Sequence, residues 1–197
     1  MIDGRSMDRM AARRELRVAG FGGQGVILFG EIVGKGASIF DKGYATLTQS
    51  YGPEARGGSC TAEVVVSREP IDYPRVVSPE VVVILAQEAY TNYGRNPAKG
   101  TVVIVDPDLV KPDPTVQPVP FSVPATRMAR DMSRPVVANI IMLGFLAAVS
   151  DLVSHDALRE AVRSSVPEGT EDLNLSAFDK GYAYGMEQFG GKRKAAN

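Results

Sequence analysis

The sequence predicts an α/β fold in which a mostly parallel sheet is followed by a helical C-terminal part. The first observation is a short apolar segment at residues 16–19, followed by a glycine-rich turn and an apolar helix from Val26. The second is an alternation of continuous apolar runs and short helical segments over residues 81–105, which is typical of parallel strands covered on both faces. The third is the change to helical patterns from Pro124 onward. Together these observations predict one three-layer, Rossmann-like domain.

The glycine-rich turn is the run Gly20-Phe-Gly-Gly-Gln-Gly25, and three of its glycines have the G-x-G-x-x-G spacing of dinucleotide-binding folds. A strand, a turn and a helix in this order place backbone N–H groups at a positive helix end, which suits an anion. The fingerprint also requires an acid about 20 residues later, at the end of the second strand. Asp41 has this spacing but lies before that strand, predicted at residues 44–48. The interpretation that the glycines only allow close packing of strand and helix stays open.

The segment after the turn predicts a helix to about Phe40, a strand at residues 44–48 and a returning strand at residues 60–67. Between the two strands, Pro53 fixes its φ angle, and glycines at positions 52, 57 and 58 permit unusual backbone angles. This composition predicts a loop with an ordered shape but little side-chain bulk. We expect it to project beside the glycine-rich turn.

The remaining elements follow in order. We predict strands at residues 81–86 and 101–105 with a helix at 87–93 between them, then an extended edge segment around Val116 and Val119. The later helices are predicted at residues 125–132, 136–149, 156–164 and 176–189. The segment 136–149 is apolar all round apart from Asn139 and Gly144, so it should be buried in the core or against another subunit.

Length and charge limit the classes of protein. The 197 residues suit one domain at residues 15–190, with a disordered leader at 1–14 and a disordered tail at 191–197. The 22 basic and 23 acidic residues nearly cancel, so no global field favours nucleic acid or an anionic membrane. The most apolar segment is too short to span a bilayer. These features predict a soluble, cytoplasmic protein.

The residues that carry chemistry are sparse. Cys60 is the only cysteine, so it cannot form an internal disulfide or supply an iron–sulfur cluster, and it is expected to be a small buried side chain. His155, the only histidine, is predicted to lie on the surface. No cluster has metal-ligand spacing, and the glycine-rich turn lacks the Lys-Ser/Thr ending of a nucleoside-triphosphate loop. This pattern favours an auxiliary chain over a complete enzyme.

Two motifs together resemble the γ subunit of 2-oxoacid:ferredoxin oxidoreductases. They are the glycine-rich turn after the first strand and the segment Thr48-Gln-Ser-Tyr-Gly-Pro-Glu-Ala-Arg-Gly-Gly58. Later blocks of the same family resemble residues 71–74, Asn139 before Leu143-Gly144, and residues 174–178. The resemblance covers about residues 15–187, and its most specific part is the 48–58 segment. The form of that segment looks most like the 2-oxoglutarate branch.

The resemblance implies a role in a larger enzyme. The complete enzyme decarboxylates a 2-oxoacid on thiamine diphosphate, passes electrons through [4Fe-4S] clusters to ferredoxin, and transfers the acyl group to coenzyme A. Thiamine diphosphate and the clusters belong to the α, β and δ subunits, whereas the γ subunit is a scaffold that helps to form the coenzyme A side of the active site. The isolated chain is expected to be inactive, with no catalytic and no metal residues. The cofactor-binding residues that the resemblance implies are Gly22, Gly23, Gln24, Gly25, Gln49, Ser50, Gly52, Pro53, Glu54, Arg56, Gly57 and Asn139.

Two alternatives remain from the sequence. One is the small subunit of indolepyruvate ferredoxin oxidoreductase, whose partner would be one large chain. The other is a stand-alone Rossmann-type dinucleotide-binding oxidoreductase, which the G-x-G-x-x-G spacing favours and the missing acid after the second strand disfavours.

Overall fold

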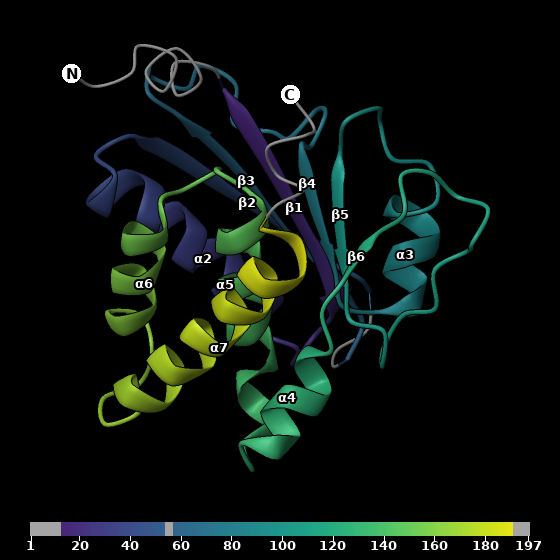
Figure 1. The fold of residues 1–197 in the computed structure, drawn as a ribbon. Helices are drawn as coiled ribbons and strands as arrows, with labels where there is room; N and C mark the ends of the chain where they lie inside the picture. Colours follow the sequence, from purple (N-terminus) through teal and green to yellow (C-terminus); the bar gives the residue numbers. More distant parts are fainter. Residues whose placement is uncertain (1–12, 54–56, 191–197) are drawn as a thin grey trace.

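A computed structural model describes residues 13–53 and 57–190 of the chain. Within these residues the strands form one six-stranded sheet in the order β2-β3-β1-β4-β5-β6 (Figure 1). Strands β1, β4, β5 and β6 run parallel, and β3 lies antiparallel between β1 and β2, so the sheet is mixed but mostly parallel, as predicted. The strands are β1 (Arg14–Phe21), β2 (Tyr44–Tyr51), β3 (Ser59–Ser67), β4 (Val81–Ile84), β5 (Val102–Val105) and β6 (Phe121–Ser122).

The helices cover both faces of the sheet, which confirms the three-layer fold. In Figure 1 helices α2, α5, α6 and α7 lie on one side of the strands, and α3 lies on the other. A short π-helix, η1, continues α2 to Phe40, where the sequence predicted the helix to end. The helical elements are α2 (Val26–Lys35), η1 (Gly36–Phe40), α3 (Gln87–Tyr93), α4 (Ala125–Asp131), η2 (Pro135–Val137), α5 (Ala138–Val149), α6 (His155–Arg163) and α7 (Glu171–Phe189).

Helix α5 is the central helix of the larger core. Apart from Ala138, its residues are buried, which confirms the interpretation of its uninterrupted apolar sequence. It crosses α7 at very short distance because glycines occupy the crossing. A Cβ atom at Gly144 would lie 1.9 Å from the Phe178 carbonyl oxygen, and one at Gly181 would lie 1.9 Å from the Ile141 carbonyl oxygen. Val136 differs from the prediction: it is 80% exposed, because the chain makes the short η2 turn before α5 begins.

Other boundaries also differ from the sequence prediction. Strand β2 continues to Tyr51 instead of ending at Thr48, because its whole length pairs with β3. Helix α7 begins at Glu171 instead of Ser176, and its first turn carries Glu171 and Asp172, whose charges favour a helix N-terminus. None of the described helices is both long and apolar enough to cross a membrane.

His155 lies at the surface, as predicted, but its ring also contacts α7. Its ring lies 4.2 Å from the ring of Tyr182 and 5.5 Å from that of Phe178 (centroid distances), so the side chain is only partly exposed. The ring of His155 therefore helps to pack the start of α6 against α7.

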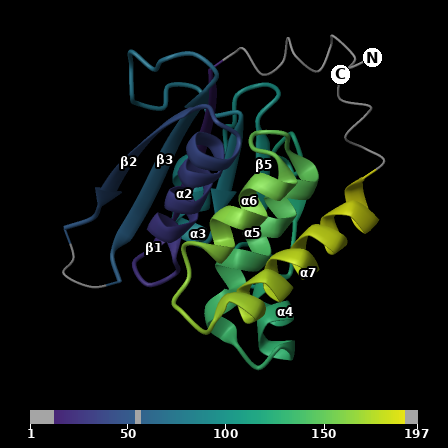
Figure 2. The same ribbon diagram turned by 90° about the vertical axis from the view of Figure 1, so that its left-hand side faces the viewer.

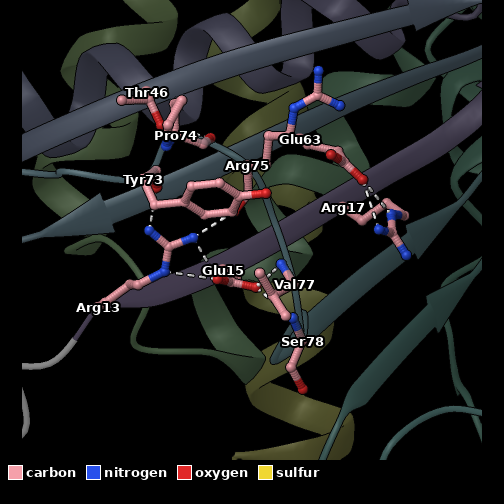
Figure 3. A network of polar contacts seen from close by, with 10 residues as sticks. All are labelled: Arg13, Glu15, Arg17, Thr46, Glu63, Tyr73, Pro74, Arg75, Val77 and Ser78. Carbon is pink, nitrogen blue, oxygen red and sulfur yellow. Dashed lines mark hydrogen bonds and ion pairs between the residues drawn. The ribbon is translucent and has the colours of Figure 1, made fainter.

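A buried carboxylate fastens the chain at the start of β1 (Figure 3). Glu15 is 6% exposed, and its Oε2 atom accepts hydrogen bonds of 2.6 Å from the amides of Val77 and Ser78. Its Oε1 atom accepts a 2.8 Å hydrogen bond from Nε of Arg13, whose guanidinium also donates to the carbonyl oxygens of Tyr73 and Arg75. The pair therefore holds the segment 73–78, which overlaps the family block at residues 71–74, against the sheet.

The same contacts set the ionisation of Glu15. Burial raises its pKa, but the Ser78 amide, the Arg13 guanidinium and the Val77 amide together lower it by more, so the pKa lies below its ordinary value. A carboxyl group whose pKa is lowered by folding stabilises the fold above its unfolded pKa. This contribution is lost as the pH falls through the folded pKa.

Replacing Glu15 with glutamine is therefore expected to lower the free energy of unfolding by about 1–3 kcal/mol at pH 7, because two amides and a guanidinium lose a charged acceptor. The difference between parent and variant should shrink as the pH falls below about 4.3, the pKa of an unperturbed glutamate. Denaturant unfolding at a series of pH values measures it. The control is Glu160→Gln, because Glu160 is half exposed and 3.9 Å from Arg163, and its effect should stay within about 0.5 kcal/mol. A Glu15→Gln loss that is equal at every pH would contradict this account.

Candidate functional site

The glycine-rich turn connects the carboxyl end of β1 to α2, at one end of the parallel strands. Gly23 and Gly25 adopt positive φ angles of 93° and 76°, which residues with a Cβ atom rarely adopt. Gly25 is the residue before α2, so the helix begins without a side-chain cap. Gly22 and Gly23 are exposed, and their bare backbone therefore leaves room for the close approach of a ligand or a partner.

The two motifs that the sequence singled out lie side by side. The Gly22 amide donates a 2.9 Å hydrogen bond to the Gly58 carbonyl oxygen, and a Cβ atom at Gly22 would lie 3.5 Å from the Gly57 nitrogen. This confirms that the second motif lies beside the glycine-rich turn. Gly57 itself has a φ angle of 70°, and Pro53 and Gly57 are both exposed. The predicted site residues Glu54 and Arg56 lie outside the described residues.

Gln24 holds the turn in place. Its Oε1 atom accepts a 2.6 Å hydrogen bond from the Phe21 amide, and its Nε2 atom donates a 2.7 Å hydrogen bond to the Leu85 carbonyl oxygen just after β4. Both ends of the side-chain amide are thus used within the chain. Gln24 therefore fixes the conformation of the turn from within the chain, and a ligand bound at the turn would contact its backbone.

Asn139 reaches the same turn from α5, more than a hundred positions later in the sequence. It is 6% exposed, and its Nδ2 atom lies 3.5 Å from the Gly25 carbonyl oxygen, at the limit of a hydrogen bond. Its Oδ1 atom accepts a 2.9 Å hydrogen bond from the Ile140 amide. A Cβ atom at position 25 would lie 2.2 Å from Asn139 Nδ2, so this asparagine requires glycine there.

Gln49 and Ser50 are placed differently from the prediction, which assigned both to a loop. They lie in β2, opposite Ala62 and Thr61 of β3, so their side chains point to opposite faces of the sheet. Gln49 Oε1 accepts a 2.8 Å hydrogen bond from the Tyr51 hydroxyl. Only Ser50 shares a face with α3. The two side chains therefore cannot contact the same small group.

A depression of about 90 Å³ lies beside the turn, between the ends of β1, β2 and β3 and helix α3. Ser50 and Gly52 line it together with Ser59 and Thr61, so its wall is rich in hydroxyl groups. Sequence reasoning missed Glu88 and Asn92 of α3, which also line it. Their spacing of four residues, which places both on one face of a helix, was the available signal. Tyr90, between them in the sequence, is buried in the core.

Cys60 also borders this depression. Burial raises the pKa of its thiol, so the thiol is neutral near pH 7 and is a poor nucleophile. Cys60 is 4% exposed, which confirms the prediction of a small buried side chain. Within residues 13–53 and 57–190 no cluster of His, Cys, Asp and Glu side chains could hold a metal ion. The wall of the depression offers hydroxyl groups from Ser50, Ser59 and Thr61, together with the carboxylate of Glu88 and the amide of Asn92.

Asp41, the acid with the spacing of the dinucleotide fingerprint, is used elsewhere. Its carboxylate accepts hydrogen bonds from the Ser154 hydroxyl at 2.6 Å and the Ser154 amide at 2.8 Å. Ser154 is the residue that caps α6, where its hydroxyl accepts a hydrogen bond from the Ala157 amide. Asp41 therefore fastens the beginning of α6, and strand β2 carries no carboxylate that could hold a ribose.

The fold and the site define an α/β domain of the Rossmann-like type, in which two glycine-rich segments form one edge. The chain belongs to the pyruvate ferredoxin/flavodoxin oxidoreductase family, because the model of that family matches residues 15–184. It is 48% identical over 182 residues to 2-oxoglutarate synthase subunit KorC of Methanocaldococcus jannaschii, with 91% of this chain and 97% of that protein covered.

Solved structures have the same fold. The γ subunit of a keto/oxoacid ferredoxin oxidoreductase from Geobacter sulfurreducens superposes with a TM-score of 0.78 at 38% identity, covering 88% of this chain and 99% of that one. The 2-oxoglutarate:ferredoxin oxidoreductase of Magnetococcus marinus, with 2-oxoglutarate, coenzyme A and succinyl-CoA bound, also gives a TM-score of 0.78. There the identity is 24%, and the match covers 89% of this chain and 31% of that one, which shows a shared fold.

Proposed function

We propose that this chain is the γ-type subunit of a 2-oxoacid:ferredoxin oxidoreductase whose substrate is 2-oxoglutarate. The similarity to 2-oxoglutarate synthase subunit KorC over almost the whole chain supports this assignment. In this proposal the partners are the α and β subunits, with a δ subunit where the clusters occupy a separate chain, and ferredoxin is reached through them. Thiamine diphosphate and the [4Fe-4S] clusters lie in those partners.

Within the complex, the chain forms part of the coenzyme A side of the active site. The observation that carries this proposal is the hydrogen bond between Gly22 and Gly58, which joins the two family motifs into one exposed edge. Gly22 and Gly23, together with Gly52, Pro53 and Gly57, offer backbone with little side-chain bulk, so a long flexible ligand can lie close to the chain. The hydroxyl of Ser50 extends this edge toward α3.

Three predicted site residues have indirect or separate roles in this proposal. Gln24 and Asn139 are positioning residues, because their side chains hold the turn from within the chain. Gln49 lies on the opposite face from Ser50 and contributes its backbone to β2. Glu54 and Arg56 belong to the 48–58 segment, and Arg56 is assigned the coenzyme A phosphates because a guanidinium fork suits a phosphate.

Replacing Arg56 with lysine tests this assignment, because lysine keeps the charge and loses the planar fork. In the assembled complex the apparent affinity for coenzyme A should weaken by about 5- to 150-fold, as expected for a bidentate contact worth about 1–3 kcal/mol. Decarboxylation of 2-oxoglutarate without coenzyme A should survive. The control is Arg95→Lys, because Arg95 is exposed on the surface and 3.4 Å from Asp113. Equal loss of both activities would assign Arg56 to assembly, and unchanged activity would exclude both roles.

The indolepyruvate alternative predicts a different substrate and one large partner chain. Purification of the complex from its source, followed by assay with 2-oxoglutarate and with indolepyruvate, separates the two. Turnover of 2-oxoglutarate supports the proposal, and turnover of indolepyruvate alone supports the alternative.

A further inference from the structure

Among residues 13–53 and 57–190, no strand pairs with the outer edge of β2. Among the described residues β2 is the terminal strand of the sheet, and it lies at the left margin of Figure 2 beside β3. The strand has eight residues, and its pairing with β3 is continuous, without a bulge. Helix α2 packs on one face of β2 and β3, as Gly30 shows by its approach to the side chains of Leu47 and Ala62. Within the part of the chain that the structure describes, β3 is the only strand that pairs with β2.

The hydrogen bonds of β2 show which residues face this edge. The Gly52 amide donates a 2.7 Å hydrogen bond to the Ser59 carbonyl oxygen, so Gly52 belongs to a hydrogen-bonded pair. In an antiparallel ladder such pairs alternate with pairs that direct their N–H and C=O groups away. The residues that direct these groups to the open edge are therefore Ala45, Leu47, Gln49 and Tyr51.

The usual protections of an edge strand are missing from β2. Such strands carry charged residues, proline or a bulge that prevent pairing with another strand. The sequence of β2, Tyr-Ala-Thr-Leu-Thr-Gln-Ser-Tyr, contains no charged residue and no proline. Large side chains lie at its two ends: Tyr44 is 48% exposed and Tyr51 is 65% exposed. Tyrosine is enriched in protein interfaces, so this edge has the composition of a contact surface.

We propose that β2 pairs with β2 of a second copy of the chain, antiparallel, about a two-fold axis through Thr48. The four outward residues, 45, 47, 49 and 51, are centred on position 48, so this register alone gives all four a partner: Ala45 faces Tyr51 of the second copy, and Leu47 faces Gln49. It forms about eight hydrogen bonds between the copies. The two six-stranded sheets then become one continuous sheet. The proposal does not depend on the coenzyme A assignment.

The side chains of β2 suit pairing with themselves. In a two-fold pairing each residue faces a residue of the same strand, so a charge near the axis would face a like charge. β2 has none. On the face of Ser50, the axis places Thr48 opposite Thr48 of the second copy, and Thr46 opposite Ser50 of the second copy. Threonine and serine pairs of this kind stabilise neighbouring strands. On the other face, Leu47 lies opposite Gln49 of the second copy.

Cross-linking tests the register. Thr48 lies on the axis in a pair that is not hydrogen-bonded, where Cα atoms are about 4.5 Å apart, within the range of a disulfide. The full-length Thr48→Cys variant should therefore form an intermolecular disulfide under mild oxidation, both alone and in the assembled complex. Ser50→Cys is the matched control, because two such residues would lie roughly 13 Å apart. The parent chain, whose Cys60 is buried, gives the background.

Solution mass provides the second measurement. The parent chain should sediment as a dimer, and Thr48→Lys, which places two like charges at the axis, should raise the dimer dissociation constant about tenfold or more. A monomeric parent chain would overturn the proposal, as would cross-linking at position 50 without cross-linking at position 48. If β2 instead pairs with a strand of a different subunit, the isolated parent chain should be a monomer and the Thr48→Lys variant should assemble poorly into the complex. This result would also exclude the two-fold pairing.

Discussion

Replacing Gly144 or Gly181 with alanine is expected to abolish the native packing of α5 on α7. Each added Cβ atom would lie 1.9 Å from a backbone carbonyl oxygen of the other helix, of Phe178 and Ile141 respectively. Backbone cannot rotate away as a side chain can, so the helices must separate. Overpacking costs about 1–3 kcal/mol even where side chains can adjust. Here we expect a loss of at least about 3 kcal/mol, which is a large part of the stability of a domain.

Thermal and denaturant unfolding of the purified variants measure this loss, and the yield of assembled complex reports it indirectly. The matched control is Gly34→Ala in α2. A Cβ atom there would meet only the Ala45 Cβ atom, at 4.0 Å, which is an ordinary contact. Because alanine favours the helix over glycine, Gly34→Ala should stabilise the protein by up to about 1 kcal/mol. Gly144→Ala or Gly181→Ala variants as stable as the parent would contradict the close crossing.

The second large effect is expected at Gly25. Alanine at this position must adopt a φ angle of 76°, which costs about 1–2 kcal/mol. Its Cβ atom would also lie 2.2 Å from Asn139 Nδ2, which adds a steric cost of about 1–3 kcal/mol. The free energy of unfolding should therefore fall by about 2–5 kcal/mol.

A double-mutant cycle separates the two causes. In an Asn139→Ala background the steric part of the Gly25→Ala cost should disappear, so the two substitutions should be non-additive by about 1–3 kcal/mol. Gly23→Ala is the control for the backbone alone, because Gly23 has a φ angle of 93° and no atom within 4 Å of its Cβ position. It should cost about 1–2 kcal/mol regardless of residue 139. Additive effects of the substitutions at positions 25 and 139 would show that Asn139 does not pack against the turn.

The sequence predicted the architecture well where local pattern and burial agree. Strands β4 and β5 are apolar throughout, and α3 has the boundaries that its pattern predicted. Boundaries were wrong where a distant partner decides them. β2 reaches Tyr51 because β3 pairs with it there, and the polar residues Gln49 and Ser50 give no local sign of a strand. The antiparallel position of β3 between β2 and β1 is likewise a tertiary outcome.

In the candidate site, too, the sequence predicted what local motifs determine and missed what distant contacts determine. The glycine motifs predicted that the turn and the 48–58 segment lie together, and the Gly22–Gly58 hydrogen bond confirms this. The internal role of Gln24 was not predictable, because its partner Leu85 is 61 positions away. Glu88 and Asn92 were missed because a short polar helix face is usually a solvated surface, and only the fold places it beside Ser50.

The most direct test is amide hydrogen exchange of this chain within the assembled complex, measured with and without coenzyme A. The proposed role predicts that coenzyme A slows exchange in residues 20–25 and 50–58, whereas 2-oxoglutarate or a nicotinamide nucleotide leaves these segments unchanged. The segment 73–78, which Glu15 fastens at the start of β1, should be unaffected by either and gives the internal control. Exchange in residues 20–25 and 50–58 that is the same with and without coenzyme A, or that slows with the nicotinamide nucleotide instead, would contradict the assignment of this edge to coenzyme A.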